Sequence, residues 1–262
     1  MPAMNIAVLI KQVPDTYSER VLKDSDWTLD RDAADAVIDE IDSRGVEAAL
    51  QLVEQHGGEV TVVTMGPERS TETLRKALAM GADKAVHVSD DGLAGSDALQ
   101  TSAALAAALG TLSVDLIITG NESTDGRTGS VPSMLAERLG LAQVTSVRSL
   151  EIDGSTLRAE RVWDGGYSEV TATLPAVISV TEKINDPRYP SFKGIMAAKK
   201  KPVSTVGIAD LGLDPAATGL TNASTVVVDG APRPPRTGGQ KITDDGTGGA
   251  KVGEFLAAAR LI

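Results

Sequence analysis

Short apolar segments of strand length alternate with helical segments over the first half of the chain, and this alternation limits the possible folds more than any other feature. The predicted strands are 5–12, 59–65, 84–88 and 115–119. Each is a nearly continuous apolar run, which is typical of strands buried on both faces of a parallel sheet. We therefore predict an α/β fold with an open, mostly parallel sheet and helices on both of its faces.

The segments between these strands have the apolar spacing of helices. In the first of them, Val46, Leu50 and Val53 share one helical face, and Asp42 or Ser43 can cap the start. The predicted helices run from 42 or 43 to about 56, from 69 to 80, from 97 to 109 and from 132 to 139.

The periodicity changes after the fourth predicted helix. Segments 144–152, 156–163 and 168–173 resemble antiparallel strands joined by tight Asp-Gly turns. Ala176–Val180 is again a continuous apolar run, as in a buried parallel strand. We expect one α/β domain over residues 1–213, with a small antiparallel hairpin extension at about 144–174.

Composition excludes several kinds of site. The chain has no cysteine, which excludes disulfides, thiolate metal ligands and a cysteine nucleophile. Its two histidines, His56 and His87, are too few and too far apart in sequence for a zinc site. His87 lies in a predicted strand, where a structural role is expected. We predict no metal and no catalytic residues.

The charge of the chain argues against binding to nucleic acid. The net charge is −11, whereas nucleic-acid binding requires a basic face. No apolar run approaches the roughly 20 residues of a membrane-spanning helix, and Met1–Lys11 lacks the features of a signal peptide. We expect a cytoplasmic protein without membrane insertion.

The loop Gly120–Val131 is the richest candidate for a ligand site. Ligands of open parallel sheets bind at the carboxyl ends of the strands, here after Leu9, at 39–42, after Met65 and after Thr119. Glycines and hydroxyl side chains in the loop suit a phosphate, the helix that follows offers free amides, and Arg127 could add a charged bond. The alternative is a Gly/Ser loop that only closes a turn between strand and helix.

The segment Lys183–Pro202 combines basic charge with an aromatic ring. Six Lys or Arg and one Asp lie between 183 and 201. Phe192 is one of only two phenylalanines, and it occurs in a polar loop stiffened by prolines, before a short basic helix that begins at Ile195. This pattern predicts an apolar side chain that a partner buries. The alternative is that Phe192 folds back onto its own domain and the lysines are only solvated.

The C-terminal quarter differs in composition from the rest. Residues 214–249 are rich in Gly, Pro, Thr and Asp, with one strand-like triplet at Val226–Val228. The last segment, Lys251–Leu261, is amphipathic. An arm over 214–262 that reaches a partner explains an apolar terminal helix better than a free tail does.

Several motifs together resemble one known family. The segment VTEKINDPRYPSFKGIMAAKKKP closely resembles the motif of electron transfer flavoprotein beta subunits. VLIKQVPDT, RKALAMGADKAVHV, VDLIITGNESTDG and the WDGGY turn follow the same family pattern in the same order, up to about residue 213. The resemblance implies an α/β fold of the adenine-nucleotide-binding type, and a heterodimer whose alpha subunit supplies most of the FAD site.

The resemblance also implies the positions of the binding residues. The structural AMP, or a second FAD, would be bound by Leu9, Asp39, Glu40, Ile41, Asp42, Met65, Gly120, Asn121, Glu122, Ser123, Thr124, Asp125, Gly126, Arg127, Thr128, Gly129, Ser130 and Val131. The partner-recognition loop would comprise Asp186, Pro187, Arg188, Tyr189, Pro190, Ser191, Phe192, Lys193, Gly194 and Ile195. Tyr17 or Thr16 would approach the flavin of the alpha subunit.

Such a subunit is a non-catalytic electron carrier. By resemblance it would dock acyl-CoA and related flavin dehydrogenases and pass their electrons to a membrane quinone oxidoreductase of the respiratory chain. Two alternatives remain at this point. One is a flavin-bifurcating type with a second FAD in this chain, and the other is a stand-alone ATP-binding module of the stress-response type.

Overall fold

The computed structural model describes residues 3–231, 233–236 and 238–262. The chain forms two compact units, Met1–Val228 and Asp229–Ile262. The described residues do not include Met1 and Pro2, at the start of the segment Met1–Lys11, or Pro232 and Thr237, in the predicted arm.

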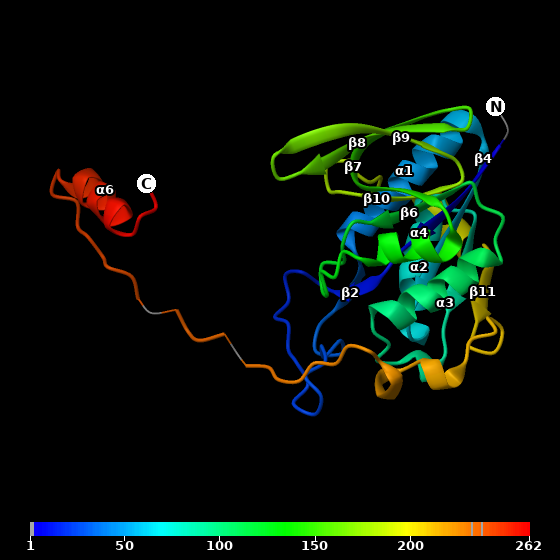
Figure 1. Ribbon diagram of the computed structural model, residues 1–262, viewed down its shortest axis with the longest axis horizontal. Helices are drawn as coiled ribbons and strands as arrows, with labels where there is room; N and C mark the ends of the chain where they lie inside the picture. Colours follow the sequence, from blue (N-terminus) through cyan, green and yellow to red (C-terminus); the bar gives the residue numbers. More distant parts are fainter. Residues whose placement is uncertain (1–2, 232, 237) are drawn as a thin grey trace. The chain divides into compact units, whose positions relative to one another are not determined.

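Within residues 3–231, nine strands form one sheet in the order β11-β5-β4-β1-β6-β10-β7-β8-β9 (Figure 1). The strands are β1 (Met4–Leu9), β4 (Gly58–Met65), β5 (Lys84–Val88), β6 (Leu116–Gly120), β7 (Ala142–Asp153), β8 (Thr156–Trp163), β9 (Gly166–Thr173), β10 (Ala176–Val180) and β11 (Val203–Val206). The central strand β1 pairs in parallel with β4 on one side and β6 on the other. The predicted open, mostly parallel sheet is confirmed.

Helices cover both faces of the parallel part, and the alternation of side chains along β1 shows why. Ile6 and Val8 pack into one core with α1 (Glu40–His56) and α2 (Thr71–Met80). Ala7 and Leu9 point the other way, into a core with α3 (Ala98–Gly110) and α4 (Val131–Leu139). Since successive strand residues face opposite sides, one apolar run supplies both cores.

The predicted hairpin extension is present, but its first strand has two roles. The start of β7 is a parallel neighbour of β10, with Ala142 opposite Ala176, and its end is antiparallel to β8. Ser146, with φ 58, lies near the register shift between these two parts. The prediction of purely antiparallel pairing was therefore wrong for the beginning of this strand.

The predicted strand 5–12 is divided in two. β1 ends at Leu9, and β2 (Gln12–Pro14) pairs with β3 (Ala36–Ile38) in a separate small sheet. The interruption leaves the backbone of Lys11 free to donate to the side chain of Asp42 at 2.8 Å. The strand ends here because a buried carboxyl group, and not a neighbouring strand, accepts the hydrogen bond from Lys11.

The remaining elements are short. The helix α5 (Phe192–Ala198) begins three residues before the predicted start at Ile195, because Ser191 caps it by accepting from the amide of Gly194. In the described part of the chain, four short 3-10 helices occupy Glu68–Ser70, Asp91–Leu93, Pro215–Ala217 and Leu220–Asn222. The triplet Val226–Val228 is not a strand.

The second unit contains the helix α6 (Gly248–Ala258), close to the amphipathic segment that the sequence predicts. No residue of α6 is buried, and Val252 and Phe255 are exposed. Within the described ranges, no helix is both long enough and apolar enough to cross a membrane.

Candidate functional site

A cavity of about 690 Å³ lies at the carboxyl ends of β1, β4 and β6. Its wall combines these strand ends with the starts of α3 and α4 and with a segment near residue 225. The cavity is lined by Leu9, Ile10, Lys11, Asp26, Thr28, Asp42, Val63, Met65, Gly95, Ser96, Asp97, Ala98, Thr101, Leu105, Thr119, Gly120, Asn121, Glu122, Ser123, Thr128, Gly129, Val131, Pro132, Leu220, Thr225, Val226 and Val227. The volume lies in the range of pockets that take small ligands.

More than half of the residues predicted for the nucleotide line this cavity. They are Leu9, Asp42, Met65, Gly120, Asn121, Glu122, Ser123, Thr128, Gly129 and Val131. The others, which do not line it, are Asp39, Glu40, Ile41, Thr124, Asp125, Gly126, Arg127 and Ser130. The structure thus gathers four separate loops at one place, while nucleotide binding itself stays a prediction.

The starts of α3 and α4 differ in what they offer to an anion. Asp97 caps α3 and forms a capping box with Gln100, so this helix start already carries a carboxylate. At α4, Ser130 makes no capping bond with its side chain, and Gly129 before it has a left-handed backbone with φ 66. Uncapped amides at a helix start favour negative charge. An anion is therefore better accommodated at α4 than at α3.

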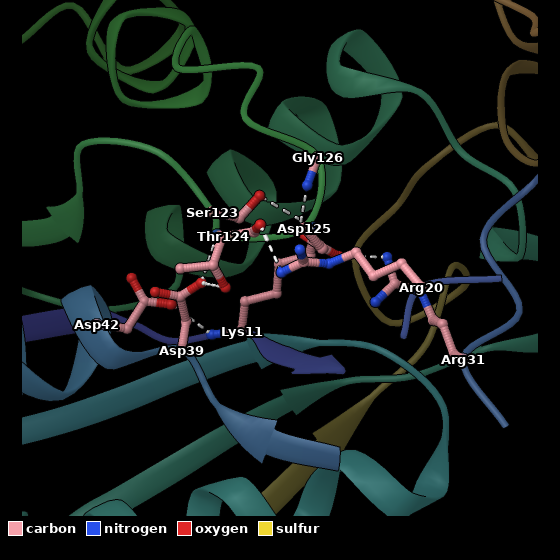
Figure 2. A network of polar contacts seen from close by, with 9 residues as sticks. All are labelled: Lys11, Arg20, Arg31, Asp39, Asp42, Ser123, Thr124, Asp125 and Gly126. Carbon is pink, nitrogen blue, oxygen red and sulfur yellow. Dashed lines mark hydrogen bonds and ion pairs between the residues drawn. The ribbon is translucent and has the colours of Figure 1, made fainter. Parts of the chain in front are cut away.

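Asp125 ties the end of β1 and the loop 15–35 to the loop that follows β6 (Figure 2). Lys11 Nζ lies 2.8 Å and Arg31 Nη2 2.6 Å from its two carboxylate oxygens. Burial alone would raise the pKa of Asp125, but the charge and hydrogen bond of Lys11, together with Ser123 and Arg31, lower this pKa well below its usual range. Lys11, which lines the cavity, thus shares this one carboxylate with Arg31.

Asp39 fixes the same loop from the other side. Its carboxylate caps α1 by accepting from the amide of Ile41 at 3.0 Å. Its second oxygen accepts from the amide of Thr124 at 2.7 Å and from the hydroxyl of Thr124 at 2.8 Å (Figure 2). Asp39 and Asp125 therefore shape the loop from outside the cavity, which explains why neither lines it.

Asp42 is a buried carboxyl that joins the ends of two neighbouring strands. One of its oxygens accepts from the amide of Lys11 at 2.8 Å, and the other accepts from the amide of Gly120 at 3.0 Å. Burial raises the pKa of Asp42, and the nearby Asp39 raises it further against the effect of these two amides. The crevice between β1 and β6 is thus held at a fixed width by one side chain of α1.

Asn121 leaves an unused acceptor at the cavity. Its side-chain oxygen is buried and has no hydrogen-bond partner among the described residues. Buried polar atoms nearly always have a partner, so an unpaired one in a cavity wall indicates a place for a donor from a ligand or a water.

Sequence reasoning missed a strap formed by residues 219–227. The amide of Leu220 donates to the carbonyl of Ala94, and the amide of Thr225 donates to the capping carboxylate of Asp97. Both of these hydrogen bonds are 3.0 Å long. Through these bonds Leu220, Thr225, Val226 and Val227 become part of the cavity wall. The only signal in the sequence was the apolar triplet Val226–Val228.

The predicted recognition loop has its aromatic side chains in solvent. Tyr189 is 96% exposed and Phe192 is 81% exposed. Phe192 therefore does not fold back onto its own domain. Tyr17, on the loop 15–35, is 98% exposed as well. His87, in contrast, is buried with its ring nitrogen 3.0 Å from the carbonyl of Gly66, which is the structural role expected of it.

An open, mostly parallel sheet with a ligand-sized cavity at the carboxyl ends of its strands defines the doubly wound class of α/β proteins. A family profile described as the electron transfer flavoprotein domain matches residues 26–211. The chain is 56% identical to electron transfer flavoprotein subunit beta of Mycobacterium bovis, over 98% of this chain and 99% of the relative.

More distant relatives have the same kind of name. Electron transfer flavoprotein subunit beta of Thermoanaerobacterium thermosaccharolyticum is 40% identical over 86% of each chain. The caffeyl-CoA reductase-Etf complex subunit CarD of Acetobacterium woodii is 38% identical over 92% of each chain. The chain belongs to the electron transfer flavoprotein family, as a member of its beta-subunit type.

Proposed function

We propose that the chain is a non-catalytic beta subunit that pairs with an alpha subunit, which holds most of the FAD. In this role it carries electrons from acyl-CoA and related flavin dehydrogenases towards a membrane quinone oxidoreductase, and its own cavity holds AMP. The observation that carries the proposal is the combination of family membership with a built cavity at the predicted nucleotide loops.

The charges around the cavity favour a nucleotide with few phosphates. Of the described residues that line the cavity, only Lys11 is cationic, and its ammonium is already paired with Asp125. Asp26, Asp42, Asp97 and Glu122 line the same cavity. A triphosphate would meet Asp26, Asp97 and Glu122 with only the paired Lys11 as a lining cation to offset its charge, whereas one phosphate can use the amides at the start of α4. This supports AMP and argues against a stand-alone ATP-binding module.

The rest of the cavity suits an adenine ring and a ribose. Leu9, Met65 and Leu105 offer apolar surface, and the unpaired oxygen of Asn121 can accept a hydrogen bond from a ligand N–H or O–H. A bound nucleotide would stabilise the folded chain, since a ligand that binds only the native state shifts the folding equilibrium.

The nucleotide can be tested by identifying what the purified heterodimer releases on denaturation. Mass spectrometry and flavin absorbance should give one FAD and one AMP per heterodimer. Two FAD per heterodimer would support the flavin-bifurcating alternative instead. Release of no adenine compound other than the single FAD of the alpha subunit would contradict a nucleotide site in this chain.

The second part of the proposal concerns docking. Phe192 is exposed and lies between basic residues on the segment 183–202, here called the recognition loop. An exposed ring with nearby cations suits a partner that has an apolar pocket and an acidic rim. Of the predicted arm 214–262, the part 229–262 forms the second unit; we propose that the arm contacts the alpha subunit through this part, because α6 exposes Val252 and Phe255 and buries none of its own residues.

Docking can be tested with Phe192→Ala in the FAD-loaded heterodimer. The variant should slow reduction of the flavoprotein by an acyl-CoA dehydrogenase with its acyl-CoA substrate, while FAD content stays unchanged. Tyr167→Ala is a matched control, because Tyr167 is an exposed ring on β9, away from the recognition loop in sequence. Equal rates for Phe192→Ala and the unchanged protein would remove Phe192 from docking.

A further inference from the structure

Arg188 connects the recognition loop to the helix α1 through two carboxylates. Its guanidinium donates to Glu47 through Nε at 2.7 Å and through Nη2 at 3.0 Å, and to Glu54 through Nη1 and Nη2. The backbone amide of Arg188 also donates to Glu47 at 3.1 Å. Glu47 is buried, and the ion pair holds the pKa values of Glu47 and Glu54 below their usual range. This group is called the Arg188 fork below.

The recognition loop has a second attachment to α1 just before the fork. The side-chain amide of Asn185 donates to the carbonyl of Arg44 at 3.0 Å. In return, the guanidinium of Arg44 donates to the carbonyl of Asn185 and to the carboxylate of Asp186. Asn185 and Arg44 thus bind each other's backbone carbonyls and fix the recognition loop on the N-terminal side of the exposed rings.

The C-terminal side of the loop is attached to α2. Arg75 on α2 donates to the carbonyl of Ala198, at the end of α5, over 2.7 Å. Gly194 lies so close to α2 that an added Cβ would be 2.4 Å from the carbonyl of Ala79. Both flanks of the loop are therefore attached to helices of the domain, and only the part between them projects.

The projecting part carries the two exposed rings. Tyr189 directly follows Arg188, and Phe192 begins α5. A surface loop that is ordered only on binding loses conformational entropy at that step, which weakens association. A loop that is already ordered does not incur this cost.

We propose that Arg188 is a positioning residue for partner docking: the Arg188 fork holds the recognition loop in its docking conformation before the partner arrives. This inference rests on the docking role proposed for Phe192. Glu47 and Glu54 lie about two turns apart on α1 and so on the same face. A planar guanidinium can bind both carboxylates at once, whereas a lysine ammonium presents a single charged point to them. Arginine is therefore the side chain that this arrangement requires.

The test uses Arg188→Lys in the FAD-loaded heterodimer. The readouts are KM and kcat for the flavoprotein as electron acceptor of an acyl-CoA dehydrogenase, and amide hydrogen exchange over residues 185–196. If the docking conformation falls to about a fifth of the population, KM rises about fivefold with kcat and FAD content unchanged, and exchange in the loop becomes faster. Unchanged KM and exchange would overturn the inference.

Two further variants separate positioning from general destabilisation. Arg148→Lys is the matched control, because Arg148 pairs with Glu160 at 2.8 Å and is as exposed as Arg188, both at 35%. It should leave KM unchanged. Glu54→Gln removes the charge and one acceptor oxygen from the solvent-exposed half of the fork and leaves the pair with Glu47, so the fold is preserved, and it should raise KM by a smaller factor than Arg188→Lys. A rise in KM of equal size for Arg148→Lys would show a non-specific effect and overturn the inference.

A double-mutant cycle distinguishes failure of this inference from failure of the docking proposal. If the fork acts through Phe192, Arg188→Lys should raise KM much less in a Phe192→Ala background than alone. Unchanged KM for Phe192→Ala alone would refute the docking role. A raised KM for Phe192→Ala together with unchanged KM for Arg188→Lys would refute only the positioning role.

Discussion

Arg75 and Lys201 cap the ends of each other's helices. Arg75, on α2, donates to the backbone carbonyl of Lys201 just beyond α5, over 3.0 Å. The ammonium of Lys201 donates in turn to the carbonyls of Leu78 at 3.0 Å, Gly81 at 3.1 Å and Ala82, at and beyond the end of α2. The last carbonyls of a helix have no partner within the helix. The backbone carbonyls at the ends of α2 and α5 thus accept hydrogen bonds from Lys201 and Arg75, in addition to the cap that Gly81 provides at α2.

Lys201→Met should lower the free energy of unfolding by about 1–2 kcal/mol, because carbonyls at the end of α2 lose a charged donor. The methionine keeps the apolar stem, so packing changes little. Urea denaturation followed by circular dichroism measures the change. Lys200→Met, at an exposed neighbouring position, is the control and should change the stability by no more than about 0.5 kcal/mol. Equal losses for the two variants would contradict the capping role.

Asp125→Asn should make the protein less sensitive to acid. In the folded state Lys11 and Arg31 hold the pKa of Asp125 below its value in the unfolded chain, about 3.9. Between these two pKa values the unfolded state binds more protons, so the stabilisation is present above about pH 4 and is lost as the pH falls.

At neutral pH the same substitution should cost about 2 kcal/mol, since Lys11 and Arg31 lose a charged acceptor. Unfolding free energies at pH 3.5 and pH 7 measure both effects. The unchanged protein should lose more stability between these pH values than Asp125→Asn does. A parallel decline of both proteins would show that the ion pairs with Asp125 do not couple folding to pH.

Much of the fold follows from local sequence patterns. The elements that the sequence did not predict, such as β11, have a common physical cause. Two strands with apolar runs, Lys84–Val88 and Ala176–Val180, are found at the predicted bounds, because burial on both faces requires such runs. Strand β11, over Val203–Val206, is short and half exposed at the edge of the sheet, so its sequence has little apolar character.

The site shows the same division. The loops at the strand ends were predictable, because the carboxyl ends of parallel strands meet at one edge of a sheet. The strap was not, because its order depends on contacts far away in sequence, such as the bond between Thr225 and Asp97. Apart from the triplet Val226–Val228, the segment 214–249 is rich in Gly, Pro, Thr and Asp and by itself indicates an unstructured segment.

Gly95→Ala should loosen the strap. Gly95 has φ 77, and an added Cβ would lie 2.5 Å from Cβ of Leu220. Strain at a positive φ and this clash both oppose the closed strap, at a cost of about 1–3 kcal/mol. We expect weaker retention of AMP by the heterodimer and faster hydrogen exchange over 219–227.

Gly110→Ala is the control for this substitution, because no atom outside its chain neighbours and its own helix backbone lies within 4 Å of a Cβ added there. It should leave the retention of AMP and the exchange of the strap unchanged. If Gly95→Ala retains AMP as well as Gly110→Ala does, the strap does not contribute to the affinity of the cavity.

Asp42→Asn should destabilise the protein, and the loss should depend on pH. Asp125 stabilises the fold at neutral pH and less in acid, whereas the contribution of Asp42 should be larger in acid. Both oxygens of Asp42 accept from backbone amides, of Lys11 and Gly120, and an asparagine can accept only one of these bonds. The other amide would be buried without a partner, which costs about 1–3 kcal/mol.

The pH dependence follows from the raised pKa of Asp42, which has burial as its main cause. Above the unfolded value of about 3.9, the native state binds the proton more tightly than the unfolded state does. Stability from this carboxyl is therefore present below about pH 4 and is lost as the pH rises through the native pKa. The asparagine does not titrate. The difference in unfolding free energy between the unchanged protein and Asp42→Asn should therefore be largest in acid and become smaller at higher pH. Urea denaturation at pH 5 and pH 8 measures this difference. A difference that grows with pH would mean that the two amides stabilise Asp42 as an anion in spite of its burial.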